Sequence, residues 1–197
     1  SALASGQVFL ATGNDLGGSL RTPAGFNGVV GLRPSPGLIP RGDRYMPFDT
    51  LWVEGPMART VEDLALMLDS MVGHDIGDPL SFKSKTGCFI ESLKRDLKPI
   101  SIAVSEDLNL VPVDSEVRKV FKTAINNLSK HGLAINDDIP DFSGVLDAFK
   151  TLRGVLMASM LGDLVNTHKD SILEDIRKNV RVGLDAKSLD IIEAEKI

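Results

Sequence analysis

The residues best suited to chemistry lie in one glycine-rich stretch, residues 12–24 (TGNDLGGSLRTPA). Two adjacent glycines lack Cβ atoms, so the backbone can take positive φ and a substrate can approach it closely. Successive N–H groups of such a turn can point into one concavity and hold an anionic oxygen. Ser19 follows the glycines directly, where a nucleophile must lie if its own attack creates that oxyanion. Asp15 and Arg21 flank the loop and would stiffen it by hydrogen bonds to the backbone or to each other.

Residue types alone leave three interpretations of this loop open. The first is a structural glycine turn with a capping serine. The second is a phosphate-binding loop, although the stretch lacks the ending of a P-loop and the GxGxxG spacing of a dinucleotide site. The third is a serine nucleophile beside an oxyanion hole. It would differ from the GxSxG elbow of the α/β-hydrolases, because Gly17 and Gly18 both precede Ser19.

Two long motifs resemble those of the amidase signature family. Residues 13–24 followed by 26–34 (FNGVVGLRP) match the family core, which begins G-S/T-D-x-G-G-S-I/L-R-x-P-A. Residues 55–63 (GPMARTVED) match the second family motif, G-P-M/L-A/T-R-T/S-x-x-D. Asn14 departs from the pattern, where the family usually has Ser or Thr, but the position stays small and polar. Two motifs in the right order make the resemblance specific.

This resemblance implies hydrolysis of an amide C–N bond through an acyl-serine intermediate. Ser19 would be the nucleophile, and Asp15 and Arg21 would support its loop. A cis-serine would relay the proton of Ser19 to a lysine and return it to the leaving amine. A lysine whose pKa is lowered by burial can act as this base. The oxyanion hole would consist of the backbone N–H groups of Leu16, Gly17, Gly18 and Ser19.

The cis-serine and the lysine of this mechanism cannot be placed in the chain. In the family both lie upstream of the nucleophile, and Ser1 and Ser5 are too close to Ser19 to serve. We therefore expect an internal part of an amidase that is inactive alone. Residues 188–197 read as a helix that stops in mid-course. The strand at residues 8–12 and the apolar helix near Phe149 would then need the remainder of the amidase chain, or a second copy, as a partner.

Two other functions stay open. One is the A subunit of an aminoacyl-tRNA amidotransferase, which releases ammonia for transamidation in a multi-subunit complex. Residues 38–55 do not resemble that branch. The other is a catalytically inert fragment, or a binding module on an amidase scaffold.

Composition indicates an ordinary globular chain. The 197 residues carry a net charge of −5, which gives no electrostatic reason to expect nucleic acid or an anionic membrane as partner. The single Cys88 excludes an internal disulfide and fits a reducing compartment, so we expect a cytoplasmic location. His74, Asp75 and Asp78 fit no zinc template and are typical of a turn. We expect no metal, no cofactor and a small-molecule amide as substrate.

The resemblance implies an α/β fold, with a central mixed sheet flanked by helices and incomplete in this chain. Residues 1–197 would form one domain, with 74–98 as a polar connector. Hydrophobic patterns predict strands over residues 8–12, 28–32, 51–56, 100–104 and 133–135. The last two would form a parallel βαβ unit with a helix over 115–130, capped by Asp114.

Other elements would position the site. Pro23 predicts extended backbone over residues 21–23, before a short helical turn around 23–26. A helix should begin after Thr60 and end at Gly73. The chain should be helical from Phe142 onward, including 169–182 and 187–197. In the family the region that corresponds to the irregular residues 38–50 lies near the substrate, so Tyr45, Met46 and Phe48 would either contact the substrate or anchor the loop. Residues 156–160 would line an acyl pocket or pack in the core.

Overall fold

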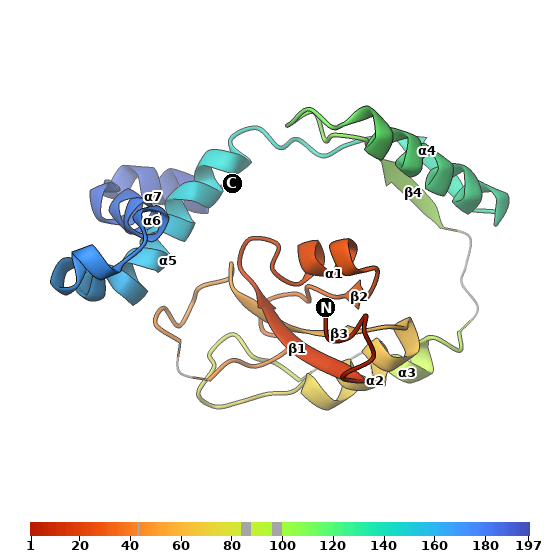
Figure 1. Ribbon diagram of the computed structural model, residues 1–197, viewed down its shortest axis with the longest axis horizontal. Helices are drawn as coiled ribbons and strands as arrows, with labels where there is room; N and C mark the ends of the chain where they lie inside the picture. The colour runs from red at the N-terminus through yellow and green to blue at the C-terminus, as the bar shows by residue number, and fades with distance from the viewer. Residues whose placement is uncertain (43, 84–87, 96–99) are drawn as a thin grey trace. The chain divides into compact units, whose positions relative to one another are not determined.

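The computed structural model describes residues 1–42, 44–83, 88–95 and 100–197 (Figure 1). The chain divides into two compact units. The larger unit comprises residues 1–94 and 148–196, and the smaller comprises residues 95–147 with Ile197. Among the described residues, no helix is both long and apolar enough to cross a membrane.

The larger unit contains an antiparallel sheet of three strands. These are β1 (Leu10–Asp15), β2 (Val30–Gly31) and β3 (Val53–Ala58), in the order β1-β3-β2. The register pairs Leu10 with Ala58 and Asp15 with Val53. The strand predicted over residues 8–12 therefore begins two residues later and runs up to the carboxylate before the glycines. The central strand β3 begins two residues after the predicted start at residue 51 and ends two residues after the predicted end at residue 56.

Helix α1 (Arg21–Asn27) follows the glycine loop. Residues 21–23 are helical, so the predicted extended conformation is wrong. The first four N–H groups of a helix have no acceptor within it, and a proline at the third position therefore loses no hydrogen bond. Gly28 ends the helix in the left-handed conformation, with φ of 61°.

Helix α2 (Val61–Met71) begins as predicted, because Thr60 Oγ1 accepts a hydrogen bond from the Asp63 N–H at 3.1 Å. Leu64, Ala65 and Leu68 bury its apolar face. The helix ends at Met71, and Gly73 is not its cap. The Gly73 N–H instead donates to the Leu38 carbonyl at 3.4 Å. A short helix, α3 (Phe89–Ser92), follows in the predicted connector.

The described residues of 38–50 form no helix or strand, as predicted. A buried ion pair ties this loop to the turn near residue 78, since Arg44 Nη2 lies 2.9 Å from Asp78 Oδ2. Burial raises the pKa of Asp78, but the N–H groups of Arg41 and Leu80 and the Arg44 guanidinium outweigh burial and lower the pKa. The loop is thus held by charge and hydrogen bonds and not by regular structure.

Three helices complete the larger unit: α5 (Val145–Thr167), α6 (Glu174–Asp185) and α7 (Ser188–Glu195), with a 3₁₀ turn, η1 (Lys169–Ser171), between α5 and α6. Helices α5 and α6 meet at Gly154 and Gly183. A Cβ atom on Gly154 would lie 2.8 Å from the Gly183 backbone nitrogen. Only glycine allows the two backbones to approach this closely.

The smaller unit is the predicted βαβ unit. Strands β4 (Ser101–Val104) and β5 (Ala134–Asp137) are parallel, and α4 (Ser115–Lys130) connects them. Asp114 caps α4 by accepting a hydrogen bond from the Glu116 N–H at 2.7 Å. None of the described residues of this unit is buried. The α/β class is confirmed, with the strands of the described residues in one antiparallel and one parallel sheet.

Candidate active site

The glycine loop joins the end of β1 to the start of α1. Ser19 and Gly17 are exposed, whereas Gly18 and Leu20 are buried. Gly18 has a φ of 109°, a backbone conformation that residues other than glycine rarely adopt. A Cβ atom on Gly18 would also lie 2.8 Å from Thr22 Oγ1. Gly18 thus lets the chain turn sharply, and Ser19, which follows it, is exposed.

The buried side chain of Asp15 fixes the conformation of this turn. It is fully buried and accepts hydrogen bonds from the Gly18 N–H at 2.7 Å and the Leu20 N–H at 3.3 Å. Arg21 adds a bidentate pair, with Nε at 2.9 Å and Nη2 at 3.1 Å from the carboxylate oxygens. Burial raises the pKa of Asp15, but the hydrogen bonds from Arg21, Gly18 and Leu20 together lower it far below its ordinary value. The predicted stiffening by Asp15 and Arg21 is therefore present in the structure.

A third residue, Arg33, completes the support and was missed as a site residue. Its Nη1 donates to the Asp15 carbonyl oxygen and lies 3.6 Å from Asp15 Oδ1. Arg33 follows β2, which brings it beside the end of β1 through the shared strand β3. The only signal in the sequence was its position at the end of the first motif.

The structure corrects the expectation for Gly18. Because its N–H group already donates to Asp15, that group is not free to bind an oxyanion. Within the part of the chain that the structure describes, the N–H groups of Leu16, Gly17 and Ser19 have no acceptor. The N–H groups of Leu16, Gly17 and Ser19 therefore stay the candidates for an oxyanion hole.

Helix α5 reaches the glycine loop through Phe149. A Cβ atom on Gly17 would lie 3.4 Å from Phe149 Cζ, so the ring packs against the loop backbone. A larger side chain at position 17 would have to displace this ring. Phe149 therefore places α5 against the glycine loop at Gly17.

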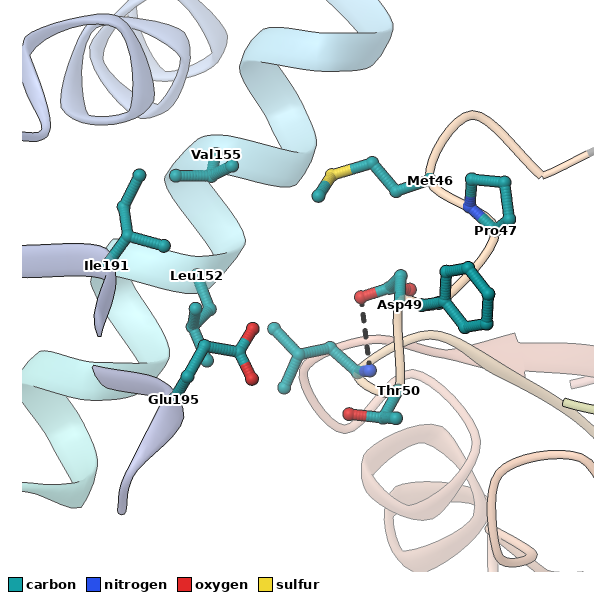
Figure 2. A pocket seen from close by; sticks show the side chains of 10 residues that line it. Met46, Pro47, Asp49, Thr50, Leu152, Val155, Ile191 and Glu195 are labelled. Atoms are coloured by element: carbon teal, nitrogen blue, oxygen red, sulfur yellow. Dashed lines mark hydrogen bonds between the residues drawn. The ribbon is translucent and has the colours of Figure 1, made fainter. Parts of the chain in front are cut away.

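A cavity of about 270 Å³ lies between residues 46–51 and the helices α5 and α7 (Figure 2). Met46 and Phe48, two of the three candidate substrate contacts, line it, whereas Tyr45 does not. Helix α5 contributes Leu152 and Val155 to the lining, and residues 156–160 contribute none. Leu156 is buried instead, at 3% exposure, which favours core packing for that segment.

Comparison with known proteins identifies the family to which the chain belongs. The family model described as Amidase matches residues 1–195. An acylamidase of Rhodococcus erythropolis is 39% identical over 142 residues, which are 72% of this chain and 30% of the relative. The A subunit of a glutamyl-tRNA(Gln) amidotransferase from a Synechococcus strain is also 39% identical, over 143 residues, which are 72% of this chain and 28% of the relative.

Solved structures agree on the fold. A bacterial aryl acylamidase of the amidase signature family superposes with a TM-score of 0.86 at 24% identity, covering 98% of this chain and 42% of the other. A peptide amidase from Stenotrophomonas maltophilia gives 0.70 at 21% identity, covering 99% and 45%. The fold is that of the amidase signature enzymes. The chain belongs to the amidase family and spans less than a third of the length of the curated relatives named here.

Proposed function

We propose that this chain carries the nucleophile of an enzyme that hydrolyses amide C–N bonds. Ser19 Oγ attacks the amide carbonyl carbon, and the resulting oxyanion accepts hydrogen bonds from the N–H groups of Leu16, Gly17 and Ser19. The C–N bond then breaks, the amine leaves with a proton, and water hydrolyses the acyl-Ser19 ester. The observation that carries the proposal is an exposed serine, on a turn fixed by buried Asp15, next to three N–H donors that have no acceptor among the described residues.

Proton transfer in this mechanism needs a cis-serine and a lysine. We propose that the cis-serine and the lysine belong to another part of the protein, so that this chain alone is inactive. The two compact units would then belong to one α/β domain, completed by the remainder of the amidase chain or by a second copy. A small-molecule amide as substrate and a cytoplasmic location belong to the same proposal.

A second candidate is the A subunit of an amidotransferase. It is favoured by one observation, the identity of 39% to such a protein, equal to that for the acylamidase. In that case the amide is a carboxamide that supplies ammonia to a partner enzyme. A catalytically inert chain is the third alternative.

Turnover by the full-length protein separates the three candidates. An amidase releases aniline from a simple acyl anilide without any partner, whereas an amidotransferase component releases ammonia from glutamine and needs its partner subunits. Ser19→Ala should lower either rate at least about a thousandfold, because the nucleophile cannot be replaced by water at the same rate. Ser5→Ala, in an exposed turn, is the matched control and should keep full activity. Anilide hydrolysis that survives Ser19→Ala would contradict the proposal.

A further inference from the structure

Two parts of the chain supply apolar side chains to the cavity beside helix α5. Residues 46–51 supply one wall, and Leu152, Val155 and Ile191 of α5 and α7 supply the other. Figure 2 shows the Met46 side chain extending from the loop toward Val155. A dry cavity of about 150 Å³ accommodates benzene. The volume of about 270 Å³ therefore suits one ring with a short substituent, or an alkyl chain of similar size.

The charge at the edge of this cavity is negative. Glu195 of α7 lines it, with the carboxylate directed toward the loop (Figure 2). Among the described residues no cation pairs with Glu195, whereas its neighbour Glu193 pairs with Lys196 at 2.7 Å. Asp49 also lines the cavity, but its oxygens accept the N–H groups of Leu51 and Trp52, each at 3.2 Å. Of the residues that the structure describes, no Lys, Arg or His lines the cavity to offset these charges.

The same face of α5 connects the cavity to the glycine loop. Phe149 packs against Gly17, and Leu152 lies three residues further along the helix. That spacing places both side chains on one face, about 4.5 Å apart along the helix axis. The cavity and the contact with the glycine loop therefore involve the same face of α5.

We propose that this cavity binds an alkyl or aryl group that carries a positively charged nitrogen. The apolar walls hold the hydrocarbon, and Glu195 pairs with the cation at the exposed edge. Identifying this group as the end of the amide substrate remote from the scissile bond rests on the proposed function. The binding preference itself depends only on the cavity.

Binding is measured on the full-length protein carrying Ser19→Ala, by NMR titration of its methyl groups with hexylammonium, 1-hexanol and hexanoate. The methyl signals of Met46, Leu152 and Ile191 should shift with all bound ligands, and those of Val117 on α4 should not. At low salt, hexylammonium should bind about two- to fivefold more tightly than 1-hexanol, as expected for one exposed ion pair. Hexanoate should bind more weakly than 1-hexanol.

Two matched variants test the role of the carboxylate. Glu195→Gln should abolish the preference for hexylammonium and leave 1-hexanol binding unchanged, whereas Glu193→Gln should keep the preference. Val155→Phe fills the cavity and should weaken both ligands. Absence of shifts at the three methyl groups, or an ammonium preference that survives Glu195→Gln, would overturn the proposal. Because position 19 is alanine throughout, these results are independent of whether Ser19 is the nucleophile.

Discussion

At the scale of single residues, Asp15 explains the shape of the site. A buried carboxylate is stable only if its oxygens accept hydrogen bonds or pair with cations, and the loop supplies both. The residue types of Asp15 and Arg21 were enough to predict that they stiffen the loop. Which N–H groups the carboxylate would occupy was not predictable, because it depends on the φ of Gly18. Arg33 was missed since its contact with Asp15 is made through the sheet, 18 residues away in sequence.

Replacing Asp15 by Asn should lower the free energy of unfolding by about 2–3 kcal/mol at pH 7, because charge-assisted hydrogen bonds to Gly18, Leu20 and Arg21 are lost. The pKa of Asp15 is lowered in the folded state, so its contribution is complete above about pH 5 and declines as the pH falls through and below its ordinary value of about 3.9.

Urea unfolding of both proteins between pH 7 and pH 3 measures this difference. Asp163→Asn, at an exposed position of α5, is the control and should change stability little at any pH. A stability difference between wild type and Asp15→Asn that grows toward low pH would contradict the account.

At the scale of elements, the sequence predicted those helix starts and ends that depend on interactions between residues close in sequence. Thr60 and Asp114 cap their helices as their residue types indicated, and the α4 bounds match the prediction. The errors lie where contacts between residues far apart in sequence determine the structure. Gly73 does not cap α2, since its N–H donates to the carbonyl of Leu38. Strand β3 continues to Ala58, two residues beyond its predicted end, because it pairs with β1 on one side and β2 on the other.

The crossing of α5 and α6 predicts a specific effect of adding one methyl group. Gly154→Ala should lower the free energy of unfolding by about 1–3 kcal/mol, because the new Cβ meets the backbone of Gly183, which cannot move aside. Gly162→Ala on the same helix is the matched control. Nothing lies within 4 Å of its Cβ, so it should stabilise the helix by about 0.5–1 kcal/mol. Equal effects of the two substitutions in denaturant unfolding would refute the assigned helix contact.

At the scale of the whole molecule, the two units differ in how much they bury. The larger unit encloses core side chains such as Leu20, Ala58 and Val180, each fully buried, whereas no described residue of the smaller unit is buried. The sequence predicted the βαβ unit correctly, since its caps and strands are local. The separation into two compact units was not visible in the hydrophobic pattern, because periodicity identifies an apolar face but not what covers it.

This difference predicts unequal hydrogen exchange in the 197-residue chain. Amides of α4 should exchange at least about 100-fold faster than amides of β3, because little apolar burial opposes opening of the smaller unit. Hydrogen-exchange mass spectrometry resolves both segments in one experiment. Protection of α4 equal to that of β3 would show that the smaller unit is stabilised in a way that the burial of its residues does not explain.

The most direct test of the central claim is to trap the acyl intermediate. The full-length protein is mixed with an activated acyl ester, quenched in acid within the first turnover, digested and analysed by peptide mass spectrometry. One acyl group is expected on the peptide that contains Ser19, and none after Ser19→Ala. Turnover with Ser19 unmodified, or an acyl group on a different residue, would contradict it.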